Sequence, residues 1–148
     1  MKSQSLTSSL LVVAISFLFV AGTIPATFGA AASPVLTKVS VTLTFTPKSQ
    51  KVSPGGTATN TVAIKNSGTK TVVFTGCIAE VKLSTQKSYS MISCSVPTPI
   101  TVAGGKTLKE GWETSFTTAA MAGTYNFKIA LTTATQESGF GTFNVVVT

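Results

Sequence analysis

The chain has 148 residues and contains no histidine, aspartate or arginine; its acidic residues are Glu80, Glu110, Glu113 and Glu137. Imidazole, paired carboxylates and guanidinium groups carry most acid–base, metal-binding and anion-clamping chemistry at neutral pH, so the composition indicates a protein that is not an enzyme and holds neither a cofactor nor a metal ion. The formal net charge of +7 comes from scattered lysines, which predicts a solvated surface and attraction to an anionic cell envelope rather than nucleic-acid binding.

The N-terminal residues have the features of an export signal. Lys2 supplies a positive start, Leu10–Ala21 is an almost uninterrupted apolar run, and Ala30–Ala32 offers small residues for cleavage. We therefore predict a helical signal peptide over residues 1–32 and a secreted or cell-surface domain over residues 33–148. The alternative is that the segment stays on the chain as a membrane anchor or a pilin-like helix, and membrane contact is expected only through it.

In the remaining chain, apolar and polar residues alternate with a period of two, and no stretch has the apolar stripe of a helix. Glycine, proline and asparagine residues typical of turns separate the alternating stretches. The predicted strands are Val39–Phe45, Thr57–Lys65, Thr71–Leu83, Ile92–Val96, Leu108–Phe116, Tyr125–Leu131 and Phe143–Val147. Because helical crossovers are missing, we expect an all-β fold, a seven-stranded antiparallel sandwich.

The third predicted strand changes phase in its middle. Val72 and Phe74 share one parity before Gly76, whereas Cys77 and Ala79 take the other parity after it. A one-residue shift centred on glycine predicts a β-bulge.

Cys77 and Cys94 are the only cysteines. In an exported chain such a pair is more often a disulfide than two free thiols. Two sulfurs without histidine or aspartate are too few for a zinc or copper site. We expect a structural disulfide.

A set of strand and turn segments carries a resemblance: Val39–Phe45, Val52–Gly56, Thr57–Lys65, Asn66–Gly68, Ala122–Tyr125 and Gly141–Val145. Together they resemble immunoglobulin-like domains of prokaryotic, in particular archaeal, cell-surface proteins of the cell-adhesion-related type. The resemblance implies an immunoglobulin-like β-sandwich that associates with itself or with other surface proteins. The cysteines depart from the antibody pattern, because they fall on the third and fourth predicted strands instead of the second and sixth.

The chain also resembles archaeal extracellular filament subunits of the thread and bundling-pilus type, which join by donor-strand exchange. In that mode an extended segment of one subunit completes the sheet of the next. The candidate donor is the segment 34–45, with Val39, Val41, Leu43 and Phe45 on its apolar side. The alternative is that this segment forms the first strand of its own domain.

Two polar residues fall on inward positions of strands that are neighbours in an immunoglobulin-like sandwich, Asn60 on the second and Glu110 on the fifth. A buried carboxylate is costly unless it is hydrogen-bonded. A hydrogen bond between these side chains, or a wet end of the sandwich, would satisfy them. The alternative is a self-formed Lys–Asn isopeptide bond promoted by the glutamate, for which Lys38 and Lys128 are the candidate lysines.

Two function classes remain. The first is a structural or adhesive surface protein, a subunit of an extracellular filament or assembly. The second is a secreted module that binds carbohydrate or another envelope component. Trp112 and Phe116 are predicted to lie in the core, and a surface position for them would favour sugar stacking.

Overall fold

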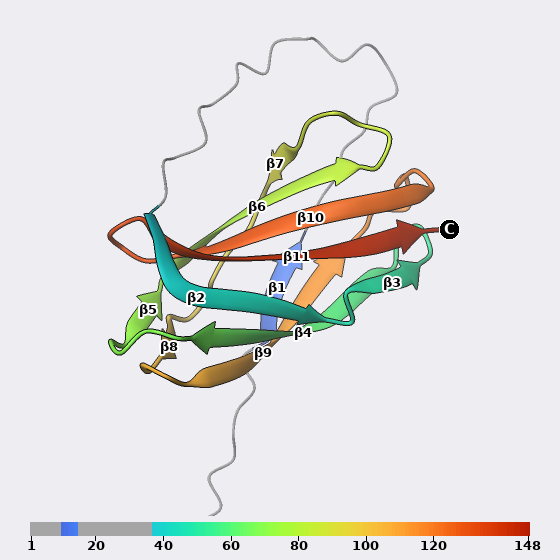
Figure 1. The fold of residues 1–148 in the computed structure, drawn as a ribbon. Coiled ribbons are helices and arrows are strands. Elements are labelled where there is room, and N and C mark those ends of the chain that lie inside the picture. The colour runs from blue at the N-terminus through green and yellow to red at the C-terminus, as the bar shows by residue number, and fades with distance from the viewer. Residues whose placement is uncertain (1–9, 15–36) are drawn as a thin grey trace, which may run out of the picture.

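The computed structural model describes residues 10–14 and 37–148 and shows an all-β protein (Figure 1). The strands are β1 (Leu10–Ala14), β2 (Thr37–Thr46), β3 (Ser49–Val52), β4 (Thr57–Asn66), β5 (Val72–Phe74), β6 (Gly76–Leu83), β7 (Ser90–Ile92), β8 (Ile100–Val102), β9 (Thr107–Ser115), β10 (Gly123–Thr132) and β11 (Glu137–Val147). The two described ranges contain no helix that is long and apolar enough to cross a membrane.

One curled sheet forms most of the domain. Nine strands belong to it, in the order β1-β9-β4-β2-β11-β10-β6-β7, with β3 also paired to β11. Strands β5 and β8 form a separate two-stranded sheet. In Figure 1 the β9-β4-β2 half lies opposite the β11-β10-β6 half, so the fold is sandwich-like and its core lies between the halves.

Alternation of side chains builds this core. In β4 every second residue is buried, from Ala58 to Asn66, while the residues between them are mostly threonine or lysine at the surface. The same rule places Val41, Leu43 and Phe45 of β2 inside. Burying one large apolar side chain stabilises the fold by about 1.5–3 kcal/mol, so the inward sets of the long strands supply most of the driving force for folding.

Aromatic rings connect the two halves across the core. Phe45 of β2 packs edge-on against Trp112 of β9 at 5.7 Å between ring centroids. On its other side Phe45 contacts Phe143 of β11 at 4.7 Å, and Phe143 stacks on Phe127 of β10 at 4.8 Å. The strands carrying these rings therefore hold fixed positions across the core, and Trp112 and Phe116 are core residues as predicted.

The expectation of a purely antiparallel sandwich is wrong, because the sheet is mixed. Strand β2 begins parallel to β11 and then pairs antiparallel with β4. After Pro47 and Lys48 the chain continues in the same direction as β3, which returns to β11 and is also parallel to it. Strand β1 adds a third parallel pairing, to β9. The passage of β2 from one half to the other joins both halves into one sheet.

The predicted strand Thr71–Leu83 is two strands. Strand β5 pairs with β8 in the small sheet, whereas β6 pairs with β10 in the main sheet. Gly76 opens β6, and a Cβ atom at this position would lie 2.9 Å from the Thr132 hydroxyl oxygen. The phase change therefore marks the point where the chain passes between sheets and not a bulge.

Other boundaries also differ from the sequence prediction. Of the predicted strand Ile92–Val96 only Ile92 lies in a strand, at the end of β7, and residues 93–96 are irregular. Strands β3 and β8 were not predicted, because three or four residues are too few for a clear alternation. Of the expected signal helix, residues 10–14 form a strand instead, and the rest lies outside the described residues.

Candidate functional site

The outer edge of β9 is a candidate assembly surface. Along its full length, β9 pairs antiparallel with β4, from Thr57 opposite Ser115 to Lys65 opposite Thr107. On its other side it pairs in parallel with β1 alone, from Leu10 opposite Gly111 to Ala14 opposite Ser115. Figure 1 shows β1 lying against β9 at this end of the sheet.

The outer edge of β9 can pair with an added strand through its backbone groups. The backbone N–H and C=O groups on the free side of an edge strand are unpaired and form a template for another strand. Strand β1 covers Gly111–Ser115, so Thr107–Glu110 have no outer strand among the described residues. The edge is therefore filled over about half of its length.

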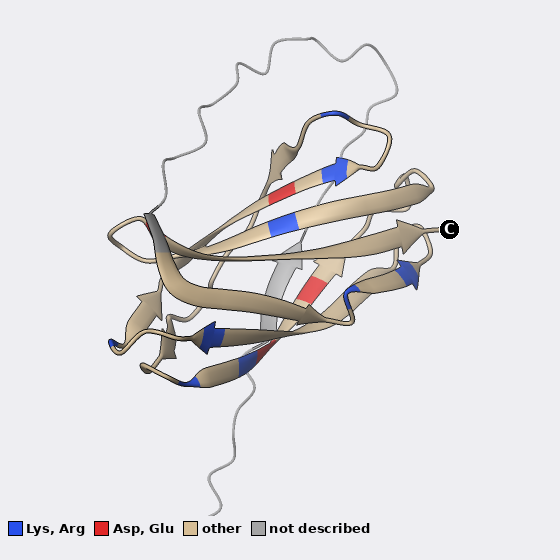
Figure 2. Cartoon of the chain, viewed as in Figure 1, with Lys and Arg blue, Asp and Glu red and all other residues tan. Residues whose placement is uncertain are grey.

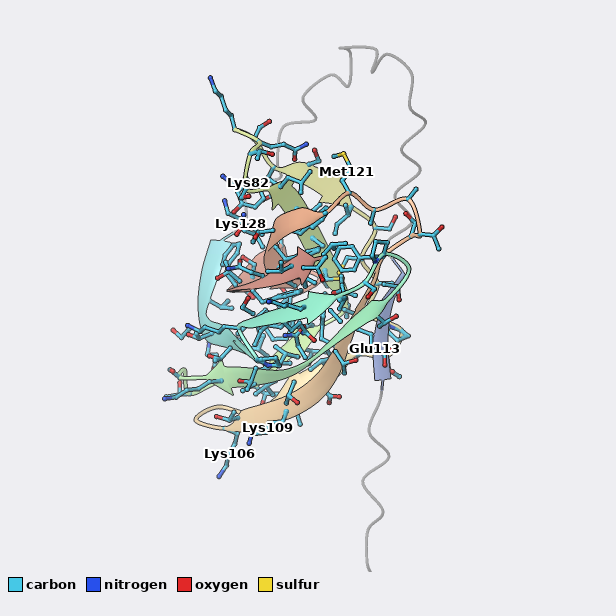
Figure 3. All side chains as sticks on the ribbon, turned by 90° about the vertical axis from the view of Figure 1, so that its right-hand side faces the viewer. Lys82, Lys106, Lys109, Glu113, Met121 and Lys128 are labelled. Atoms are coloured by element: carbon cyan, nitrogen blue, oxygen red, sulfur yellow. A yellow bond between two sulfur atoms is a disulfide. The ribbon has the colours of Figure 1, made fainter. Side chains whose placement is uncertain are left out.

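The inward face of β9 anchors the strand. Trp112 and Thr114 are fully buried, and the Trp112 indole Nε1–H donates a hydrogen bond to the Thr114 hydroxyl at 3.2 Å. The outward parity carries Gly111, Glu113 and Ser115. Figure 3 shows Glu113 on the side of β9 where β1 lies. The core contacts of β9 are therefore made by residues of the inward parity.

Glu110 lies at the uncovered end of this edge and is half-buried. It is the cross-strand partner of Val62. Partial burial removes water from the carboxylate and raises the pKa of Glu110 above its ordinary value. The acid therefore carries an electrostatic cost in its ionised form.

Asn60 is buried as predicted but does not contact Glu110. Its Nδ2 donates a hydrogen bond to the Pro47 carbonyl oxygen at 2.6 Å, and its Oδ1 accepts one from Gln50 Nε2 at 3.0 Å. Trp112, and not Glu110, is opposite Asn60 in the register. The amide therefore holds the β2–β3 connection against β4, and the predicted Asn60–Glu110 hydrogen bond is wrong.

The geometry also argues against the candidate lysines of an isopeptide bond. Lys128 is exposed on β10, and its Nζ lies 3.9 Å from the centroid of the Tyr89 ring, away from the core-facing Asn60. The backbone of Lys38 is placed in β2, but its side chain lies outside the described residues. The partners of the Asn60 side chain are Pro47 and Gln50, so among residues 39–148 its hydrogen bonds are not made to a lysine.

The segment considered as a donor strand is β2 of its own domain. Val41, Leu43 and Phe45 are buried in the core, and Val39 is partly buried against it. Strand β2 pairs with β4 and β11 of the same chain. The part of the chain that pairs as an added strand is instead β1, which the sequence marked only as the apolar run of an export signal. The two adjacent valines of β1 are β-branched, and this was the available sign of a strand.

The disulfide Cys77–Cys94 is present, with 5.7 Å between the Cα atoms. It ties β6 to the irregular segment that follows β7, so only Cys77 lies on a strand. Disulfides persist in oxidising compartments such as the periplasm and the extracellular space. The bond agrees with such a location.

Comparisons with known proteins are limited to the fold. No protein family and no curated protein matches the chain. Among solved structures, it is similar to the sporulation control protein Spo0M from Bacillus subtilis, with 12% identity and a TM-score of 0.53 over 72% of this chain and 48% of that one. This likeness supports a β-sandwich-like fold and nothing about activity.

Two further solved structures match more weakly. A family 123 glycoside hydrolase from Clostridium perfringens has 9% identity and a TM-score of 0.49 over 68% of this chain and 22% of that one. A cycloisomaltooligosaccharide glucanotransferase from Paenibacillus sp. has 17% identity and the same TM-score of 0.49, over 76% and 14%. The chain spans less than half the length of each of these three proteins.

Proposed function

We propose that this chain is a non-enzymatic extracellular protein with a structural or adhesive role, a subunit of a cell-surface filament or assembly. The observation that carries the proposal is the parallel pairing of β1 with the outer edge of β9. An edge that takes a strand from outside the core of its domain is what strand-addition assembly requires. In this proposal a second copy supplies that strand, which requires that residues 1–32 stay on the chain instead of being removed as a signal peptide.

Two features support an immunoglobulin-like sandwich of the prokaryotic surface type. The strands β2, β4 and β9 occupy one half and β6, β10 and β11 the other, as the first, second and fifth strands and the third, sixth and seventh do in that fold. The Tyr125 hydroxyl near the start of β10 donates a hydrogen bond to the Met121 carbonyl oxygen at 2.9 Å. This contact matches the tyrosine corner of such domains.

The donated strand comes from the chain before β2. Removing β2 would take Val41, Leu43 and Phe45 out of the core, whereas β1, among the described strands, pairs with β9 alone. Residues 15–36 separate β1 from β2, and a segment of that length reaches up to about 70 Å when extended. That reach exceeds the roughly 30 Å width of a small domain. Strand β1 can therefore reach and pair with the β9 edge of a neighbouring copy.

The function is tested with the full chain, expressed with its own N-terminal segment and isolated from the cell surface or the medium. Light scattering and electron microscopy should show concentration-dependent oligomers or filaments, and intact mass gives the N-terminus that they retain. A strictly monomeric chain over the whole concentration range would reject the assembly function.

The donor is tested with two differently tagged copies, one carrying Val12→Cys and the other Glu113→Cys, because these positions are paired in the register. Strand exchange predicts a disulfide-linked heterodimer. In the control, the second copy carries Lys109→Cys instead of Glu113→Cys. Lys109 lies on the same strand but outside the residues that β1 pairs with. Oligomers without the specific cross-link, or oligomers that lack residues 10–14, would overturn the β1 donor but leave the assembly function standing.

A second function, binding of an envelope component, is favoured by a different observation. Trp112 and Phe116 are buried and offer no sugar-stacking surface. On the opposite half of the sheet, however, Lys82 of β6 and Lys128 of β10 both lie near the ring of the half-buried Tyr89, which precedes β7. A charged envelope polymer fits that surface better than a neutral sugar.

A further inference from the structure

An aromatic and cationic cluster lies on the outer face of the β6-β10 pair. The Nζ of Lys128 lies 3.9 Å from the centroid of the Tyr89 ring, and the Nζ of Lys82 lies 5.1 Å from it. Tyr89 is half-buried in the segment between β6 and β7. Figure 2 shows lysines on β6, on β10 and in the loop after β6 gathering at this side of the molecule.

The strand register brings the two lysines together. Lys82 of β6 is opposite Asn126 of β10, and Lys128 of β10 is opposite Glu80 of β6. The lysines are therefore diagonal neighbours on one face of the sheet. Figure 3 shows Lys82 and Lys128 on the same side of the molecule, far from Lys106 and Lys109.

Neither ammonium group has a carboxylate partner. No lysine nitrogen of residues 39–148 lies within the 4.0 Å of a carboxylate oxygen that defines an ion pair. Glu80 is the one acid on the paired segment, against Lys82, Lys128 and the exposed Lys87 of the adjoining loop. Glu80 offsets one of these three positive charges, so the face keeps a net positive charge.

We propose that the Tyr89–Lys82–Lys128 face binds the anionic groups, carboxylate or sulfate, of an acidic polysaccharide. The two ammonium groups lie close to one ring, so their positive charges act together on an anion that approaches this face. Asn126 on the same face supplies an amide that can bond to sugar hydroxyls. This site is independent of the β9 edge and lies on the other half of the sheet.

The proposal is tested by titrating the full chain with dextran sulfate, polygalacturonate, uncharged dextran and vesicles of phosphatidylglycerol, at about 50 mM and about 300 mM salt. We expect binding to the two acidic polymers, weakened by salt, and none to uncharged dextran. Polygalacturonate and dextran sulfate then distinguish carboxylate from sulfate as the preferred group. Binding to vesicles without binding to either polymer would overturn the proposal in favour of a membrane surface.

Matched variants separate this site from general charge attraction. The double variant Lys82→Gln/Lys128→Gln should lower affinity for the acidic polymer about tenfold. Lys106→Gln/Lys109→Gln, which removes the same charge elsewhere, should change it less than about twofold. Equal losses in the two double variants would show that only net charge matters and would reject the site.

Substitutions of Tyr89 test the role of the ring without changing the net charge of the protein. Tyr89→Phe keeps the ring and should retain the affinity, whereas Tyr89→Leu should lower it several-fold. Thermal unfolding of each variant checks that the domain stays folded. Unchanged affinity of a folded Tyr89→Leu variant would contradict the role of the ring. Because these variants leave β9 intact, their outcome does not depend on the assembly function.

Discussion

The side chain of Asn60 donates a hydrogen bond from Nδ2 to the carbonyl oxygen of Pro47 at 2.6 Å. Pro47 lies between the end of β2, which pairs with β4, and the start of β3. Gln50 of β3 completes the contact: its Nε2 donates to the Asn60 side-chain Oδ1 and to the Thr59 carbonyl oxygen, and its Oε1 accepts from the Thr59 N–H. One buried amide thus fixes the passage of the chain between the two halves of the sheet.

Replacing this amide should destabilise the domain. Asn60→Ala leaves the Pro47 carbonyl oxygen without this donor and removes one of the hydrogen bonds of the Gln50 amide, so we expect the free energy of unfolding to fall by about 1–3 kcal/mol. Thr61→Ala, at an exposed position of the same strand, is the control and should change it by less than about 0.5 kcal/mol. Urea denaturation of both variants measures the difference, and equal midpoints would refute the role of Asn60.

Gly141 should not tolerate a side chain. A Cβ atom there would lie 2.6 Å from Leu43 Cβ and 2.8 Å from Phe45 Cε2. These contacts are closer than van der Waals packing permits, so Gly141→Ala forces β2 away from β11 and is expected to cost about 1–3 kcal/mol. Thr142→Ala, an exposed neighbour on β11, is the matched control. Thermal unfolding of the pair gives the measurement, and a Gly141→Ala variant as stable as its control would contradict this close packing.

Glu110 should make stability depend on pH. Burial raises the pKa of its carboxyl in the folded state, so the folded protein binds this proton more tightly than the unfolded chain does. The contribution of Glu110 to stability is then fully present below the unfolded pKa, near the ordinary value of 4.5, and is lost as the pH rises through the folded pKa. Glu110→Gln should therefore gain stability relative to the native protein between acid and neutral pH.

Denaturation at about pH 3.5 and about pH 7 measures this effect. Glu113→Gln removes a negative charge from the same strand and corrects for the change in net charge. If the stability difference between Glu110→Gln and the native protein stays constant over this range, the pKa of Glu110 is not raised in the folded state.

Loss of the disulfide should destabilise the domain without changing its fold. Cys77 and Cys94 are separated by 17 positions in the sequence. Closing a loop of that size lowers the conformational entropy of the unfolded chain and so stabilises the folded state by about 3 kcal/mol. Cys77→Ser/Cys94→Ser should lower the free energy of unfolding by about that amount in the absence of reductant. Adding reductant should lower the native protein to the level of the variant and leave the variant unchanged. Mass spectrometry confirms that the disulfide has been fully reduced. If the reduced native protein is then as stable as the oxidised one, the prediction is contradicted.

Much of the strand content could be predicted from the sequence. In β2, β4 and β10 the alternation of apolar and polar residues extends over many positions, and each strand is found where it was expected, whereas only the second half of β11 was predicted. Asn60 was correctly placed inside for the same reason. Short strands escaped prediction, as did the division of Thr71–Leu83 at Gly76, because a glycine within an alternating stretch is compatible with a bulge and with a change of sheet.

The sequence by itself determined that the domain after residue 36 is all-β, that its acid–base chemistry is sparse, and that its cysteines form a pair. These properties depend on composition and on a local period. Only the tertiary structure decided that β2 crosses from β11 to β4, that Asn60 bonds to Pro47 and not to Glu110, and that β9 accepts β1. The physical reason is that hydrogen-bond partners and sheet edges are set by contacts between residues distant in the chain, and a local pattern of side chains does not specify which strand lies beside which.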